Sequence, residues 1–185
     1  MSASPRAHLH FETARLRVRP LAESDRELYC ALYTDPETMR FIGSPLGSEP
    51  AIRSFAKALC APHRTPVRDL FFTVIERRSN RPIGLCSLQH LDLHDRSVEA
   101  GMILRADVRA RGYAREGLAA LVARAFAVFE IDEVWVQASA NHAIAQRLVI
   151  GVGFTRDDDA SADRGGARQV WRISRTAAAG AQENG

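Results

Sequence analysis

A ten-residue stretch, Arg105–Ala114 (RADVRARGYA), combines small and cationic residues in a way that suits phosphate binding. Gly112 lets the backbone turn and approach an anion without a Cβ in the way, and Ala114 keeps the following turn thin. Arg109 and Arg111 add cationic donors beside the turn. The stretch has neither the GK[ST] ending of a P-loop nor the GxGxxG spacing of a dinucleotide-binding turn. From these residues alone, a phosphate site and an ordinary turn are equal alternatives.

The elements predicted on either side place this stretch between a strand and a helix. Residues 98–104 alternate, with Glu99 and Gly101 on the face opposite to Val98, and residues 115–129 carry an apolar stripe at helical spacing. A strand that leads through a small-residue turn into a helix presents unpaired backbone N–H groups and the positive end of the helix dipole. This order favours the phosphate interpretation.

Periodicity predicts alternating strands and helices along the rest of the chain. Strands are expected at 15–19, 70–75, 83–88, 134–139, 154–156 and 169–174, and helices from Ser24 or Asp25 to Tyr33, around 52–59, and at 141–150. The economical packing is a mixed sheet with helices on both faces. Residues 11–175 are expected to form a single domain, with flexible tails at 1–10 and 176–185.

Composition and charge limit the class of protein. The 185 residues are 46% hydrophobic and 25% charged, and the formal net charge of +3 is spread over many arginines and acids. This spread argues against a nucleic-acid binder. Cys30, Cys60 and Cys86 lie far apart without metal-ligand spacing, which favours buried free thiols and no metal site. Without an apolar stretch of about 20 residues, no membrane span is expected. We therefore expect a cytoplasmic protein that binds neither nucleic acid nor membrane.

The pattern Arg109-x-x-Gly112-x-Ala114 resembles the Q/R-x-x-G-x-G/A pyrophosphate loop of the GNAT superfamily of acyl-CoA N-acyltransferases. The resemblance continues in order over most of residues 11–156. The opening FETARLRVRPLAESDRELYCALYTDPETMRFIG is similar to the first strand and helices of ribosomal-protein N-terminal acetyltransferases, and the segment from Glu99 to Phe154 is similar to their cofactor core.

The resemblance implies an α/β (α+β) GNAT fold, with a mixed, mostly antiparallel sheet of about seven strands and about four flanking helices. It implies a splay between the strands at 98–104 and 134–139, with acetyl-CoA as co-substrate in the gap. Asn141 would hydrogen-bond the pantetheine arm; on the residues alone it is also a good N-cap of the next helix, and it could serve both. The backbone of Met102, Ile103 and Leu104 would pair with pantetheine, and the pyrophosphate would lie on Arg109, Ala110, Arg111, Gly112, Tyr113 and Ala114.

Acetyl transfer to an amine needs a base for the ammonium and a proton for the leaving thiolate. The resemblance gives the base role to Glu99, acting through water; a solvated surface carboxylate is an equal alternative. His90 is a second candidate base or a structural histidine. The serine that this branch offers as proton donor is replaced by Ile144, and the last helix has no tyrosine. His142 or solvent would then supply the proton, or the step is unassisted.

The resemblance therefore predicts an N-acetyltransferase that moves an acetyl group from acetyl-CoA to a primary amine by direct attack in a ternary complex. The amine acceptor is a protein N-terminus or a small molecule. The alternative is a catalytically degenerate GNAT domain that binds acyl-CoA as a sensor or scaffold, because the usual serine and tyrosine are missing. A homodimer is compatible with the resemblance, and loops at 42–50, 61–69 and 157–167 carry no readable acceptor code.

Overall fold

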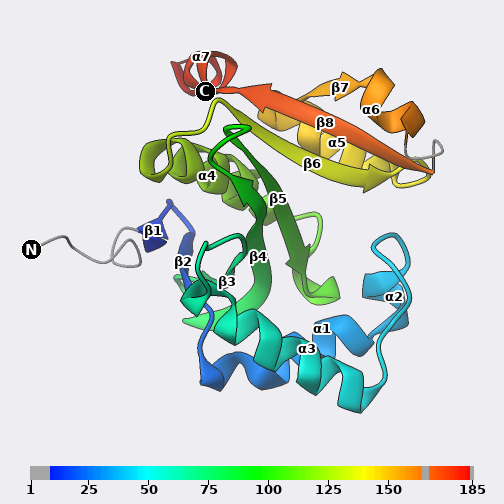
Figure 1. The fold of residues 1–185 in the computed structure, drawn as a ribbon. Coiled ribbons are helices and arrows are strands. Elements are labelled where there is room, and N and C mark those ends of the chain that lie inside the picture. The colour runs from blue at the N-terminus through cyan, green and yellow to red at the C-terminus, as the bar shows by residue number, and fades with distance from the viewer. Residues whose placement is uncertain (1–8, 164–166, 184–185) are drawn as a thin grey trace, which may run out of the picture.

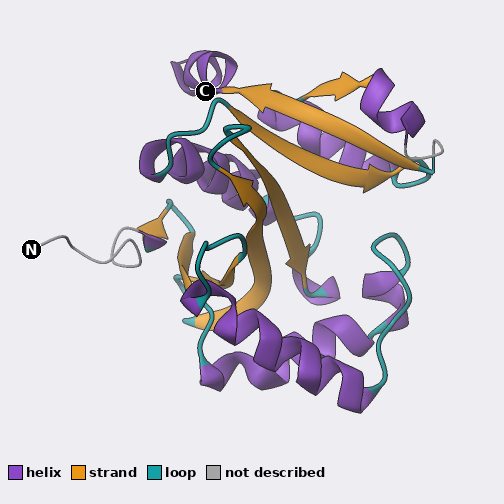
Figure 2. Ribbon diagram, viewed as in Figure 1, coloured by secondary structure: helices purple, strands orange, loops and turns teal. Residues whose placement is uncertain are grey.

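In the computed structural model, which describes residues 9–163 and 167–183, one mixed sheet is flanked by helices on both faces (Figure 1). Figure 2 distinguishes by colour the strands, in orange, from the helices that cover them, in purple. The eight strands of the described residues follow the order β1-β2-β3-β4-β5-β6-β8-β7. Among these described strands, β5 and β6 run parallel to each other, and the other neighbouring pairs are antiparallel. The predicted architecture is therefore confirmed.

The strands agree with the alternating and apolar segments of the sequence with small shifts at their ends, except that β4 extends over twelve residues where 83–88 were predicted. The bounds are β1 (Phe11–Glu12), β2 (Leu16–Pro20), β3 (Leu70–Glu76), β4 (Arg81–Asp92), β5 (Ser97–Leu104), β6 (Glu133–Ser139), β7 (Thr155–Asp157) and β8 (Arg168–Ser174). The predicted hairpin is β3 and β4, and the predicted final pair is β7 and β8. Strand β1 was not predicted, because a strand of two residues is too short to show alternation.

Of the seven α-helices in the described residues, apolar spacing predicts four, and three short or terminal ones carry no such signal. The bounds are α1 (Arg26–Thr34), α2 (Pro36–Met39), α3 (Ser48–Cys60), α4 (Tyr113–Val128), α5 (Ala143–Val152), α6 (Asp158–Asp163) and α7 (Arg175–Glu183). Helix α7 occupies most of the segment predicted as a tail at 176–185. Its small residues favour helix but bury only Ala178 among those whose burial is described, so apolar periodicity could not reveal it.

Two hydrophobic cores lie on opposite faces of the sheet. On one face, Leu28 of α1 and Phe55 of α3 pack with Leu85 of β4. On the other face, α4 packs against β5, and the contact is so close that a Cβ added at Gly117 would lie 2.8 Å from Met102 Cε. The alternation of β5 therefore directs its odd-numbered side chains toward α1 and α3.

Asp25 anchors the first helix through a buried ion pair. Its carboxylate accepts hydrogen bonds from both Nη atoms of Arg19 at 2.6 and 2.8 Å and from Thr73 Oγ1 at 2.7 Å. These bonds and one from the backbone N–H of Ala22 outweigh burial and hold the pKa of Asp25 below its usual value. Asp25 occupies the N-cap position of α1, but its side chain bonds the strands and the preceding turn and makes no cap bond to the helix.

The parallel pairing of β5 with β6 is short, and the two strands then diverge (Figure 1). The ladder contains three residue pairs, which end at Glu99 and Trp135. Beyond this point β5 stays paired with β4 as far as Leu104, and β6 stays paired with β8 as far as Ser139. The predicted splay in the middle of the sheet is therefore confirmed.

Three further observations concern membrane spans, metal-binding groups and the cysteines. Within the described residues, none of the helices combines the length and apolarity that a membrane span requires. The same residues contain no group of three or more His, Cys, Asp or Glu side chains that could hold a metal ion. Cys86 is buried, whereas Cys30 is partly exposed and Cys60 is exposed, which corrects the expectation that all three thiols are buried.

Candidate active site

The splay leaves one backbone edge of β5 without a neighbouring strand in the described part of the chain. Met102, Ile103 and Leu104 pair with β4 on their other side, so their outer edge is open to an extended ligand. The carbonyl of Leu104 already accepts a hydrogen bond of 3.2 Å from Arg109 Nε. The residues predicted to pair with pantetheine therefore lie where such pairing is geometrically open.

The loop between β5 and α4 has the backbone that an anion-binding turn requires. Gly112 precedes α4 with φ = +81°, and Ala110 has φ = +61°, so two residues within three adopt the left-handed region. The first helical hydrogen bond runs from the N–H of Glu116 to the carbonyl of Gly112. The N–H groups of Tyr113 and Ala114 thus precede the helical ladder and remain available to an anion.

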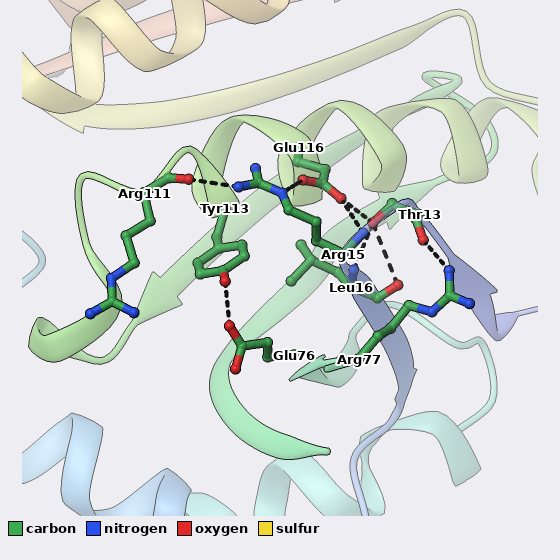
Figure 3. A network of polar contacts seen from close by, with 8 residues as sticks. All are labelled: Thr13, Arg15, Leu16, Glu76, Arg77, Arg111, Tyr113 and Glu116. Atoms are coloured by element: carbon green, nitrogen blue, oxygen red, sulfur yellow. Dashed lines mark hydrogen bonds and ion pairs between the residues drawn. The ribbon is translucent and has the colours of Figure 1, made fainter. Parts of the chain in front are cut away.

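The two loop arginines have different roles in the structure. Arg109 turns toward α2, where its Nη2 donates to Thr38 Oγ1 at 2.8 Å and its Nη1 lies 3.7 Å from Glu37 Oε1. It therefore ties the loop to α2 as well as to β5. Arg111 is exposed, and its side chain extends away from the neighbouring network (Figure 3). Arg111 is the loop cation that is better placed to meet a phosphate.

A polar network lies beside the loop, along the first turns of α4, and joins the loop to the segment that leads into β2 (Figure 3). Arg15 Nη1 donates to the carbonyl of Arg111 at 2.9 Å, and its Nε donates to Glu116 Oε2 at 2.6 Å. The same guanidinium lies over the ring of Tyr113, 4.6 Å from the centroid. Tyr113 donates its hydroxyl to Glu76, and this bond raises the pKa of Tyr113. Tyr113 is buried, so the backbone is the part of this residue that can reach a pyrophosphate.

Glu99 lies at the point where β5 and β6 separate. Its carboxylate is 18% exposed, and its Oε2 lies 3.5 Å from Nε2 of His90, which is 68% exposed. The His90 ring stacks on Trp135 of β6, with centroids 6.0 Å apart. His90 adopts φ = +52° where the β4–β5 register shifts, and this bulge turns its ring toward Glu99. The structure therefore places both candidate bases together at the end of the three-pair ladder.

The segment that joins β6 to α5 differs from its prediction. Helix α5 begins at Ala143, with His142 at the N-cap position, so Asn141 lies in the preceding turn and does not cap the helix. Asn141 is exposed, and its backbone N–H donates to Ser139 Oγ at 3.4 Å. The cap interpretation is wrong, while the predicted contact between Asn141 and pantetheine stays a prediction.

His142 and Ile144 bear on the missing proton donor. The His142 ring stacks on Phe41, with centroids 4.2 Å apart, and this contact joins the loop after α2 to α5. Burial, together with the charge of Arg109, lowers the pKa of His142 below its usual value. The cationic form of His142 is therefore disfavoured, and the neutral ring is a poor proton donor. Ile144, where the resemblance leads us to look for a serine, is 69% exposed.

Several residues of this region carry no signal in the sequence. Arg15 belongs to the alternating RLRVR segment, where its type and spacing equal those of Arg17. Phe41 and Thr38 lie in a turn-rich stretch that shows no period. Their contacts with His142 and Arg109 depend on tertiary packing, which alternation and helical spacing do not encode.

Comparison with known proteins agrees with this geometry. Residues 15–155 match the acetyltransferase (GNAT) domain, which is more than half of the chain. The chain therefore belongs to the GNAT acetyltransferase family, and this membership supports acyltransferase activity. No curated protein sequence matches the chain.

Solved structures share the fold at low sequence identity. An acetyltransferase from Agrobacterium tumefaciens is 23% identical, with a TM-score of 0.73 over 90% of this chain and 94% of that one. The spermidine N-acetyltransferase from Vibrio cholerae, in complex with CoA and spermine, is 18% identical, with a TM-score of 0.74 over 90% and 99%. RimL, a ribosomal alpha-N-protein acetyltransferase in complex with coenzyme A, is 12% identical, with a TM-score of 0.72 over 88% and 95%.

Proposed function

We propose that this chain transfers the acetyl group of acetyl-CoA to a primary amine in a ternary complex. The observation that carries the proposal is an open strand edge that begins beside Glu99 and ends at an anion-binding turn. Five residues, 100–104, separate Glu99 from the loop, and at about 3.3 Å per residue they span roughly 16 Å. The pantetheine arm has two amide groups, so it can pair with such an edge as a strand does.

The phosphates of the donor fit the loop chemistry. The N–H groups of Tyr113 and Ala114 and the dipole of α4 favour an anion, and Arg111 adds a cation. With the pyrophosphate held there and pantetheine along β5, the thioester would lie close to Glu99. In this arrangement the phosphates would bind at the loop, and the reaction would take place at the other end of the β5 edge, beside Glu99.

The proposed reaction assigns one proton transfer to the chain. Glu99 accepts a proton from the substrate ammonium through water, which leaves the nitrogen with a free electron pair. That pair forms the bond from nitrogen to the acetyl carbon while the bond from carbon to sulfur breaks, and the electrons stay on sulfur. The new amide nitrogen then loses its second proton to solvent. His90, 3.5 Å from Glu99, can pass the accepted proton to solvent. Solvent protonates the thiolate, because the cationic form of His142 is disfavoured and Ile144 has no proton to give.

The acceptor would approach from the face of α1 and α3. Glu99 shares its face of β5 with Ile103, which packs against the cluster of α1 and α3 that contains Leu28 and Phe55. A protein N-terminus and a small amine both fit this description. The two structural neighbours named for spermidine and for a ribosomal protein illustrate these acceptor classes, and the resemblance in sequence favours the protein N-terminus.

A second candidate function is a GNAT domain that binds acyl-CoA without turnover. The observation that favours it is the lack of a proton donor at Ile144 and His142. A CoA thiolate is, however, a good leaving group near neutral pH, so an acid is not essential to the reaction. We therefore place the transferase first.

Release of CoA thiol from acetyl-CoA distinguishes the two functions. The protein is incubated with a panel of peptides and small amines, and wild type is compared with Glu99→Gln and with Glu49→Gln, an exposed exchange in α3. We expect at least one amine to release thiol, a roughly hundredfold lower kcat in Glu99→Gln, and no change in Glu49→Gln. Tight binding of acetyl-CoA without release above the hydrolysis blank would support the sensor.

A further inference from the structure

A carboxylate lies next to the place where the pyrophosphate is proposed to bind. Glu116 is in the first turn of α4, four residues after Gly112. An acid in this position interacts favourably with the helix dipole, but it would repel a phosphate on the same helix end. The charge of Glu116 must therefore be balanced if the loop is to hold a pyrophosphate.

Arg15, one residue before β2, provides this balance. Its Nε bonds Glu116 Oε2 at 2.6 Å, and its backbone N–H bonds Glu116 Oε1 at 2.9 Å. Thr13 Oγ1 adds a bond of 2.5 Å to the same carboxylate. Burial disfavours the ionised form, but these bonds outweigh it and lower the pKa of Glu116, so the carboxylate stays charged and paired.

The same guanidinium also fixes the shape of the loop. Its Nη1 holds the carbonyl of Arg111, which directs that carbonyl toward Arg15 (Figure 3). Its Nη2 lies 3.2 Å from the position that a Cβ on Gly112 would occupy. One side chain thus bonds the Arg111 carbonyl and crowds the space beside Gly112, where the left-handed turn is made.

We propose that Arg15 is a positioning residue for the pyrophosphate-binding loop. It holds the Arg111 carbonyl on the inner side of the turn and neutralises Glu116, so that the N–H groups at the start of α4 face an anion. The proposal rests on the proposed use of acetyl-CoA. A lysine has one point of charge and cannot bond Glu116 and Arg111 with a rigid fork, so arginine is the residue type that this geometry requires.

The test compares acetyl-CoA with a donor that lacks its nucleotide end, the pyrophosphate included. Acetyl-CoA and acetyl-pantetheine, which lacks the pyrophosphate, are titrated calorimetrically into wild type, Arg15→Gln, Arg15→Lys and Arg17→Gln. Arg17 is the matched control, because it lies on the same segment and bonds Asn80 away from the loop. We expect Arg15→Gln to raise the Kd for acetyl-CoA about tenfold and that for acetyl-pantetheine less than twofold. Arg15→Lys should be intermediate, and Arg17→Gln should match wild type.

A double variant tests the charge balance itself. In Arg15→Gln with Glu116→Gln, the unpaired carboxylate is removed, and part of the lost affinity for acetyl-CoA should return. A merely structural role of Arg15 predicts no such recovery. Equal weakening of both donors by Arg15→Gln, or an effect no larger than that of Arg17→Gln, would overturn the inference; if Arg15→Gln does not fold, Arg15→Lys decides by the same comparison. If wild type does not prefer acetyl-CoA over acetyl-pantetheine, the proposed placement of the donor fails instead.

Discussion

Replacing Gly112 with alanine tests the backbone of the candidate anion-binding turn. The added Cβ would occupy a residue with φ = +81° and would lie 3.2 Å from Arg15 Nη2. The left-handed conformation costs an alanine about 1–2 kcal/mol relative to glycine. The crowding adds to this cost, because Arg15 is held by Glu116 and by the Arg111 carbonyl.

The cost can be measured in either of two ways. If the loop keeps its shape, the strain lowers the melting temperature by about 2–8 °C, at roughly 2–4 °C per kcal/mol for a domain of this size. If the loop relaxes, the same 1–2 kcal/mol is lost from binding, and the Kd for acetyl-CoA rises about fivefold to thirtyfold. The loss in free energy of unfolding and the loss in free energy of binding should together amount to about 1–2 kcal/mol.

The assay pairs thermal unfolding without ligand with calorimetric titration of acetyl-CoA. Gly180→Ala is the control, because it lies in α7 and nothing lies within 4 Å of the added Cβ. If Gly112→Ala keeps both the melting temperature and the affinity of wild type, the left-handed turn is not needed and our account of the loop is incorrect.

Three further predictions concern stability. Asp25→Ala should lower the free energy of unfolding in urea by about 3 kcal/mol, because it leaves the charge of Arg19 partly buried and unpaired; a loss under 1 kcal/mol would contradict this. Because the pKa of Asp25 is lowered on folding, wild type should lose stability as the pH falls below about 4, and Asp25→Asn should show a shallower loss in acid urea titrations. Gly84→Ala should lower the melting temperature, because its Cβ would lie 2.3 Å from the carbonyl oxygen of Ile103, and an unchanged value would show that β4 and β5 separate freely there.

The parts of the fold that the sequence predicts are those governed by local periodicity. The alternation of β5 and the apolar stripe of α4 each depend on neighbouring residues alone, so the strand, the loop and the helix follow in order. Helix α7 could not be predicted in this way, because its attachment to the rest of the domain depends on Arg175. That guanidinium bonds the carbonyls of Phe126, Phe129 and Ile131 at 2.6–3.1 Å, all distant in sequence.

The residues of the candidate site also fall into those that local sequence predicts and those that only tertiary contacts reveal. Gly112 is predictable because a backbone turn before a helix selects glycine from its neighbours. Arg15 is not, because nothing in RLRVR distinguishes it from Arg17 until the strand is placed beside α4. The roles of Arg109 and Arg111 are likewise separated only when α2 supplies partners for Arg109. Spacing thus predicts where the loop lies, and tertiary contacts decide which cation faces outward.

The three-pair ladder between β5 and β6 has a consequence for handling the protein. Two stretches of strand face each other without pairing in the described residues, and an unpaired strand edge is a template on which other chains aggregate. A ligand that lies along β5 would cover that edge, and at a hundredfold excess over its Kd it would add about 2.7 kcal/mol to the stability of the folded state. Purification and storage with CoA should therefore preserve the monodisperse protein, and dialysis to remove it should promote precipitation.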